Sequence, residues 1–254
     1  MIGYYGKSDI GKKRSNNQDT FMITELPGEA LFAVVCDGMG GANGGKEASS
    51  LAASVFTDRV VAALNGADPV KMTGADIARI LSDSASAANE SVYEKSLEER
   101  ELSGMGTTLA AVLFCSGRAY VANVGDSRVY LADRDHIEQV THDHSYVQYL
   151  VDMGVMTEKE AKTAPNRNII IRAVGIEKNL ETDISTVSVL KKKLKETELL
   201  ICTDGLSGPL EESEIHRILI GGDSLEKQAE KLIAAANEKS GSDNITAVVI
   251  KPDV

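Results

Sequence analysis

The chain has 254 residues, 27 of them Lys or Arg and 38 Asp or Glu, which gives a formal net charge of −11 at pH 7. This charge disfavours bulk electrostatic binding to nucleic acid or to an anionic membrane, so we expect neither as a partner. The composition is 43% hydrophobic and 26% charged, as in ordinary globular proteins, and every apolar run is far shorter than the ~20 residues that span a bilayer. We therefore expect a cytoplasmic protein with one domain, residues 1–254, although two small domains would also suit this length.

The cysteines are three in number and lie in or beside apolar runs, at Cys36, Cys115 and Cys202. An odd count of apolar-flanked thiols indicates buried cysteines in a reducing compartment. Arg118 follows Cys115 by only three residues, too few for a loop of amides around a phosphate. The sequence therefore disfavours cysteine-nucleophile chemistry.

The first half of the chain predicts strands, then two long helices, then strands again. Short apolar runs predict a strand meander over Tyr4 to Ser8, Thr20 to Glu25 and Leu31 to Asp37. Helical spacing begins at Gly45 and ends at Asn65-Gly66, and a capping pattern at Thr73 opens a second helix that runs to about Leu102. Three short-linked strands follow, expected to pair antiparallel with one another: Thr107 to Phe114, Ala119 to Val124 and Ser127 to Leu131.

The second half begins with a polar segment and returns to alternating strands and helices. Residues 143–164 predict two short helices, the second capped by Thr157 and Glu160, and residues 145–170 are a candidate flap. Further elements are expected at Thr182 to Val189, Glu198 to Thr203, Glu211 to Ile220, Asp223 to Ser240 and Ile245 to Lys251. Together these patterns predict an α+β fold, a four-layer α-β-β-α sandwich of two antiparallel sheets flanked by helix pairs.

Four aspartates fall at the ends of predicted strands. They are Asp37, Asp126, Asp204 and Asp243. Carboxylates that converge at the rim of a buried sheet repel one another unless a cation keeps them ionised, and oxygen-rich ligand sets suit Mg²⁺ or Mn²⁺ better than zinc. A single Asp-Gly pair more often marks a turn, so spacing alone leaves turn and metal ligand as equal alternatives.

The glycine-rich run from Gly38 to Gly45 is similar to a phosphate-binding loop between a strand and a helix. It lacks the third glycine of a dinucleotide fingerprint, because Asn43 stands there, and Lys46 is followed by Glu47 instead of Ser or Thr. Nucleotide binding is therefore the weaker interpretation of this loop.

The motifs together resemble the metal-dependent type 2C protein serine/threonine phosphatases, in their compact bacterial form. In order along the chain they are Arg14-Ser-Asn-Asn-Gln-Asp19, Asp37-Gly-Met-Gly-Gly41, Gly106-Thr-Thr108, Val124-Gly-Asp-Ser-Arg128, Thr141-His-Asp-His144, Arg172-Ala-Val-Gly175, Cys202-Thr-Asp-Gly-Leu206 and Gly241-Ser-Asp-Asn-Ile-Thr246. The resemblance runs from about Gly3 to Lys251. Eight ordered motifs are far more specific than any one of them.

The resemblance implies a centre of two Mn²⁺ or Mg²⁺ ions. Asp37 would bridge the ions, the Gly38 carbonyl would bind one, and Asp204 and Asp243 would bind the other. Asp126 would hold a third, weaker ion together with Asp204.

The resemblance also assigns residues around that centre. Arg14 would bind the phosphate, Asp19 would hold metal-bound water, and Gln18 and Asn244 would lie beside the ligands, with Gln18 standing where Glu is usual. Met39 replaces a histidine found in some relatives, so no side-chain general acid is expected there. His142 and His144 are expected to be structural.

The implied function is hydrolysis of phosphoserine and phosphothreonine in phosphorylated proteins. Attack would come directly from the water shared by the two ions, and the enzyme would oppose a bacterial Ser/Thr kinase. The competing hypothesis is a non-catalytic phosphoprotein-binding regulatory module on the same fold. Binding alone does not require Asp37, Asp204 and Asp243 together, so the presence of all three favours the enzyme.

Overall fold

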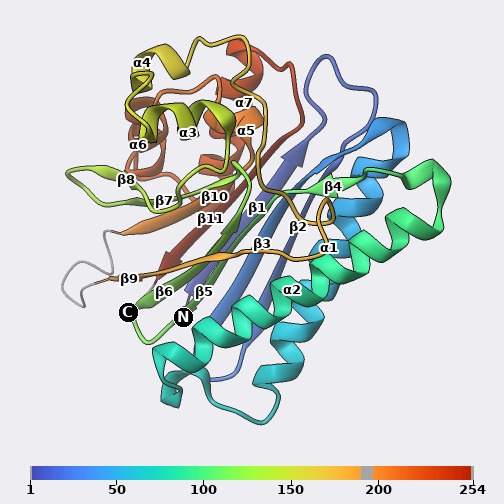
Figure 1. Ribbon diagram of the computed structural model, residues 1–254. Coiled ribbons are helices and arrows are strands. Elements are labelled where there is room, and N and C mark those ends of the chain that lie inside the picture. Colours follow the sequence, from blue (N-terminus) through green and yellow to red (C-terminus); the bar gives the residue numbers. More distant parts are fainter. Residues whose placement is uncertain (1, 190–196, 253–254) are drawn as a thin grey trace.

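Two antiparallel sheets stack face to face, and helices cover both outer faces (Figure 1). The computed structural model describes residues 2–189 and 197–252. Within these residues one sheet has the strand order β1 (Ile2–Asp9), β11 (Ile245–Pro252), β10 (Glu198–Cys202), β7 (Arg128–Ala132) and β8 (Ile137–Gln139). The other has the order β2 (Asp19–Leu26), β3 (Ala30–Met39), β5 (Leu109–Cys115), β6 (Arg118–Val124) and β9 (Asp183–Ser188), with the short β4 (Gly106–Thr107) paired to β3.

The long helices α1 (Gly41–Leu64) and α2 (Gly74–Glu98) pack on the β2–β9 sheet. On the opposite side, α6 (Glu212–Leu219) and α7 (Leu225–Lys239) cover the β1–β8 sheet (Figure 1). Short helices α3 (Tyr146–Asp152), α4 (Glu158–Ala161) and α5 (Asp204–Ser207) gather near one end of the sheets. Single 3₁₀ turns lie at Pro69–Lys71 and Arg100–Leu102.

The sheets hold together because their central strands are apolar on both faces. In β3, Phe32, Val34 and Cys36 face the α1 and α2 helices, whereas Leu31, Ala33 and Val35 face the other sheet. A third apolar cluster lies between the β1–β8 sheet and α5, α6 and α7. Side chains alternate across a strand, so a continuous apolar run fills two layers at once. The predicted α-β-β-α class is confirmed.

Two predicted strand pairings are wrong. β1 does not form a meander with β2 and β3, because it pairs with β11 in the other sheet. β7 likewise leaves β6 and pairs with β10. The chain changes sheets at Gly125, whose φ of 101° is a backbone conformation that glycine adopts most readily.

Several local predictions are confirmed and others need small corrections. Thr73 and Thr157 cap α2 and α4 through their side chains, as their capping patterns indicate. α1 begins at Gly41, four residues before the predicted start, and α2 ends at Glu98. The cysteines Cys36, Cys115 and Cys202 are free and buried. None of the helices in the described ranges is long and apolar enough to cross a membrane.

Candidate active site

Four of the predicted aspartates come together where the two sheets meet at one end. Asp19 is the first residue of β2 and lies opposite Asp37 in β3. Asp204 begins α5 directly after β10, and Asp243 lies two residues before β11, which pairs with β10. The two sheets are also joined here, because Oδ2 of Asp19 accepts hydrogen bonds from Thr203 Oγ1 at 3.0 Å and Thr246 Oγ1 at 2.6 Å.

The carboxylates oppose one another's ionisation. Burial first, and then the charges of the neighbouring aspartates, raise the pKa of Asp37 well above its ordinary value. The pKa of Asp204 is raised by burial and by Asp243, and the pKa of Asp126 by burial and by Asp204. Burial raises the pKa of Asp19 to about 7 against the effect of its two threonine hydrogen bonds. Positive charge placed among these groups would favour their ionised forms.

Several carboxylate oxygens in this cluster lack partners. Oδ1 of Asp19, Oδ1 of Asp126 and Oδ1 of Asp204 are buried without a hydrogen bond among the described residues. Native proteins rarely leave buried polar atoms unpaired, and oxygens of this kind are the ligands of hard divalent cations. The donor set therefore fits Mg²⁺ or Mn²⁺.

Protein side chains alone do not complete a coordination shell here. Within residues 2–189 and 197–252, no three His, Cys, Asp or Glu side chains are grouped so that they could hold one ion. Mg²⁺ sites commonly use one or two carboxylates and several waters. The arrangement is therefore that of a water-rich site and differs from a closed cage.

Arg14 lies at the edge of the carboxylate cluster. Its Nη2 donates to Oδ2 of Asp243 at 2.8 Å, and half of its side chain is exposed. Sequence reasoning placed Arg14 on the phosphate and Asp243 on a cation, and did not anticipate their ion pair. An exposed guanidinium can exchange such a partner at low cost, because exposed ion pairs contribute little to stability.

Gln18 and Asn244 hold the loops that carry the aspartates. Oδ1 of Asn244 accepts from the Gln18 backbone N–H at 2.9 Å, and its Nδ2 donates to the carbonyls of Ile10 and Asn16. Nε2 of Gln18 donates to the Gly41 carbonyl at the start of α1. An ionised Glu has no proton to donate to the Gly41 carbonyl. Gln at position 18 therefore makes a contact that Glu could not make.

Gly38 makes a close backbone crossing. A Cβ atom on Gly38 would lie 1.9 Å from the carbonyl oxygen of Gly45, so no larger residue fits without moving α1. The Gly38 N–H donates to the Gln18 carbonyl at 3.2 Å. The glycine after Asp37 is thus required by packing.

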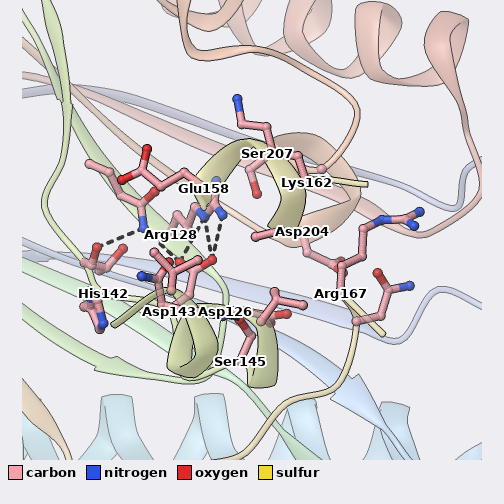
Figure 2. A pocket seen from close by; sticks show the side chains of 18 of the residues that line it. Asp126, Arg128, His142, Asp143, Ser145, Glu158, Lys162, Arg167, Asp204 and Ser207 are labelled. Carbon is pink, nitrogen blue, oxygen red and sulfur yellow. Dashed lines mark hydrogen bonds and ion pairs between the residues drawn. The ribbon is translucent and has the colours of Figure 1, made fainter. Parts of the chain in front are cut away.

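A cavity of about 620 Å³ opens beside Asp126 and Asp204 (Figure 2). Residues of the candidate flap, among them Glu158, Lys162 and Arg167, form one wall, and α5 contributes Ser207. At its side Arg128 binds the Asp143 carboxylate with Nε at 3.0 Å and Nη2 at 2.6 Å. The flap segment therefore shares one cavity with Asp126 and Asp204.

Comparisons with known proteins agree with this geometry. A family profile described as Protein phosphatase 2C matches residues 5–248. The chain belongs to the protein phosphatase 2C family. The Listeria monocytogenes protein "Serine/threonine phosphatase stp" is 33% identical over 250 residues, which cover 98% of this chain and 95% of that protein.

Solved structures extend the agreement to the fold. The Mycobacterium tuberculosis serine/threonine phosphatase PstP/Ppp has a TM-score of 0.84 and 32% identity, covering 100% of this chain and 99% of that one. The catalytic domain of PstP in complex with two manganese ions has a TM-score of 0.80 and 32% identity, covering 98% and 97%. The predicted family and the predicted activity, a protein serine/threonine phosphatase, are confirmed.

Sequence reasoning left some residues of this phosphatase site without a role. Thr107 and Thr108 surround the backbone of Asp37: Thr107 Oγ1 and the Thr108 N–H both donate to the Asp37 carbonyl at 2.9 Å. In the sequence, the Gly106-Thr-Thr108 motif contributes to the family resemblance and predicts no role for either threonine. Two adjacent threonines directly before a buried strand were the sequence feature that could have indicated this role.

The two candidate histidines make structural contacts. Nδ1 of the buried His144 accepts from the Gly125 N–H at 3.0 Å, and the His144 N–H donates to the Gly125 carbonyl at 2.9 Å. Burial first lowers the pKa of His144, in keeping with a neutral ring. His142 is exposed and pairs with Asp152 of α3 at 2.8 Å. His144 thus supports the turn that carries Asp126.

Proposed function

We propose that this phosphatase hydrolyses phosphoserine and phosphothreonine in proteins with two divalent cations, Mn²⁺ or Mg²⁺. Asp37, the Gly38 carbonyl, Asp204 and Asp243 would hold the ions. The observation that carries this assignment is the buried, unpartnered Oδ1 of Asp204 within a cluster of mutually repelling carboxylates. The two manganese ions bound by the PstP catalytic domain support it. Such ions, when bound, supply an activated water for attack on phosphorus and offset phosphoryl charge.

Arg14 binds the phosphoryl group of the substrate. Its guanidinium already lies against the carboxylate cluster through Asp243 and is half exposed, so it can turn to an incoming dianion. The planar fork of an arginine donates two parallel hydrogen bonds to phosphate oxygens. This contact orients the phosphorus for attack from the carboxylate side.

Asp19 orients the attacking water. The Thr203 and Thr246 hydroxyls hold its Oδ2, which leaves Oδ1 to accept a hydrogen bond from water. Bound cations would favour the ionised form of Asp19, which accepts such a bond.

The departing Ser or Thr oxygen needs a proton, and Met39 cannot give one. Asp126 and Asp204 would hold a third, weaker cation, which would make a nearby water a better proton donor. Oδ1 of Asp126 has no hydrogen-bond partner among the described residues and would be available for this role.

The substrates are phosphorylated proteins, and we propose that they include those of a bacterial Ser/Thr kinase. We further propose that the enzyme is cytoplasmic, that residues 1–254 act as one domain, and that the flap segment 145–170 contacts the substrate. The flap lines the cavity beside Asp126, which supports the last of these assignments. A regulatory module that only binds phosphoproteins would not explain the buried carboxylate cluster, and relatives named as phosphatases disfavour it.

The test is metal-dependent turnover with matched aspartate variants. We expect hydrolysis of a phosphothreonine peptide with Mn²⁺ and none after EDTA. Asp37→Asn and Asp204→Asn each remove a ligand charge and should lower kcat about 10³-fold or more. Asp58→Asn, on the exposed face of α1, is the control and should keep full activity. Turnover that survives metal removal, or folded Asp37 and Asp204 variants with wild-type rates, would overturn the proposal.

A further inference from the structure

Thr108 interrupts the strand ladder at the residue opposite Asp37. β3 pairs with β5 as far as Val35 and Ala110, and with β4 again at Gly38 and Thr107, so Thr108 lies across from Asp37. The Thr108 N–H makes the ordinary ladder bond to the Asp37 carbonyl. The Asp37 N–H, however, donates to Thr108 Oγ1 at 2.9 Å. A side-chain hydroxyl therefore takes the place of a backbone carbonyl.

The same hydroxyl reaches the turn that carries Asp126. Oγ1 of Thr108 lies 2.7 Å from Oγ of Ser127, the residue directly after Asp126. One buried chain of hydrogen bonds thus runs from the Asp37 backbone through Thr108 to Ser127, and neither side chain is exposed.

The methyl group of Thr108 contacts the other side of that turn. A Cβ atom on Gly125 would lie 2.7 Å from Thr108 Cγ2, so the two residues are in close contact. His144 holds Gly125 from elsewhere through two hydrogen bonds. The turn at Asp126 is therefore held by His144, by Asn123 Nδ2 through the Gly125 carbonyl at 3.5 Å, and by Thr108. Of these three residues, Thr108 also hydrogen-bonds to Asp37.

We propose that Thr108, with Ser127, is a positioning pair that sets the Asp126 turn against Asp37. The inference rests on the proposed roles of Asp37 and Asp126. Asp126 would hold its cation together with Asp204, and a loosely bound ion tolerates little displacement of its few protein oxygens. Because the pair is buried, no water replaces a lost hydroxyl, and the turn loses its connection to β3.

The test separates the hydroxyl of Thr108 from its methyl group. Thr108→Val keeps the shape and removes the hydroxyl, Thr108→Ser keeps the hydroxyl, and Ser127→Ala removes the partner. Thr57→Val is the matched control, because Thr57 is a buried threonine of α1 whose hydroxyl contacts Met22 Sδ at 3.6 Å, away from the site. Mn²⁺ binding is titrated calorimetrically without substrate, and kcat/KM is compared for a phosphopeptide and p-nitrophenyl phosphate.

We expect Thr108→Val and Ser127→Ala to weaken the weakest Mn²⁺ binding step about tenfold. Both variants should lower the ratio of phosphopeptide to p-nitrophenyl phosphate activity. Thr108→Ser should stay within about twofold of wild type, and Thr57→Val should change neither quantity. If Thr108→Val does not fold, Ser127→Ala carries the test, because it leaves the bond between Asp37 and Thr108 in place.

Wild-type Mn²⁺ binding and substrate ratio in folded Thr108→Val and Ser127→Ala proteins would overturn the inference. An equal loss in Thr108→Ser would also overturn it, since packing would then explain the effect. Asp126→Ala separates a failure of the positioning role from a failure of the third-cation assignment. If it changes both readouts while Ser127→Ala changes neither, only the positioning role fails; if Asp126→Ala changes neither, the third-cation assignment fails with it.

Discussion

Arg14 illustrates how one residue can serve two partners at this site. It forms an ion pair with Asp243, yet its exposure leaves it free to turn to a phosphoryl group. The hydrogen bond to Asp243 first, and then the charges of Asp243, Asp37 and Asp204, raise the pKa of Arg14, so a positive charge stays beside the cluster. The residue therefore favours both the ionised cluster and an anionic substrate.

Arg14→Ala should raise KM for a phosphopeptide about 10- to 100-fold, the range of a lost hydrogen bond to a charged group. Mn²⁺ affinity should not fall, because Asp243 loses a competing partner. Steady-state kinetics and calorimetric titration measure the two effects. The control is Lys13→Ala, an exposed neighbour expected to behave as wild type. An unchanged KM, or Mn²⁺ binding lost in parallel with activity, would contradict the phosphate role.

Asp126→Ala should preserve the two-cation core and lose about 10²–10⁴-fold in phosphopeptide turnover, the range of general acid catalysis. The loss on p-nitrophenyl phosphate should be much smaller, because its phenolate leaves without a proton. The rates on both substrates, together with the melting temperature, distinguish a catalytic role of Asp126 from a structural one. Equal losses with a lowered melting temperature would show that Asp126 only supports its turn.

At the scale of elements, the site depends on how closely α5 approaches the start of β11. A Cβ atom on Gly205 would lie 1.9 Å from the carbonyl oxygen of Asn244, which is backbone and cannot rotate away. Asp204 and Asp243 lie next to these two residues. The contact between the two elements therefore sets the spacing of two predicted ligands.

Gly205→Ala should force α5 and β11 apart, lowering stability by about 1–3 kcal/mol and activity with it. Gly74→Ala is the matched control, because its Cβ would meet Tyr120 Cε1 at an ordinary 3.4 Å within α2. That change should be neutral or stabilising by up to ~1 kcal/mol. Denaturant unfolding and kcat measure both variants, and equal stability of the two proteins would refute the spacing argument.

At the scale of the whole molecule, the carboxylate cluster makes the metal-free fold pH-sensitive. Burial raises the pKa of Asp19 to about 7, and those of Asp37, Asp126 and Asp204 move in the same direction. Between the unfolded pKa of about 4 and the raised folded values, the folded protein binds more protons than the unfolded chain. Its stability therefore falls as the pH rises through this range.

Mn²⁺ should reverse this trend, because bound cations stabilise the ionised carboxylates and the fold that holds them. We expect the rise in melting temperature on adding Mn²⁺, relative to EDTA, to grow from about pH 5 to pH 8. Exposed carboxylates titrate equally with Mn²⁺ and with EDTA, so the difference in melting temperature reports on the carboxylate cluster alone. Asp37→Asn should reduce the effect, and a Mn²⁺ increment that is independent of pH would refute this account.

Much of the molecule follows from local sequence patterns. Capping at Thr73 and Thr157, the continuous apolar run of β3 and the aspartates at strand ends are all short-range features. Because backbone and side-chain preferences act over a few residues, such features predict elements and the kinds of residue at a site. The family followed from the ordered motifs and was confirmed.

Tertiary structure decided which elements meet. Consecutive strands usually pair with each other, and an apolar pattern does not say which sheet a strand joins, so the sequence did not place β1 beside β11 or β7 beside β10. The same holds for contacts between distant residues, such as Arg14 with Asp243 and Thr108 with Ser127. Arg14 and Asp243 are far apart along the chain and become neighbours because β1 pairs with β11, whereas Thr108 meets Ser127 at the end of the β5–β6 hairpin. Local sequence preferences do not specify these contacts, because the choice of strand partners depends on the packing of the whole core.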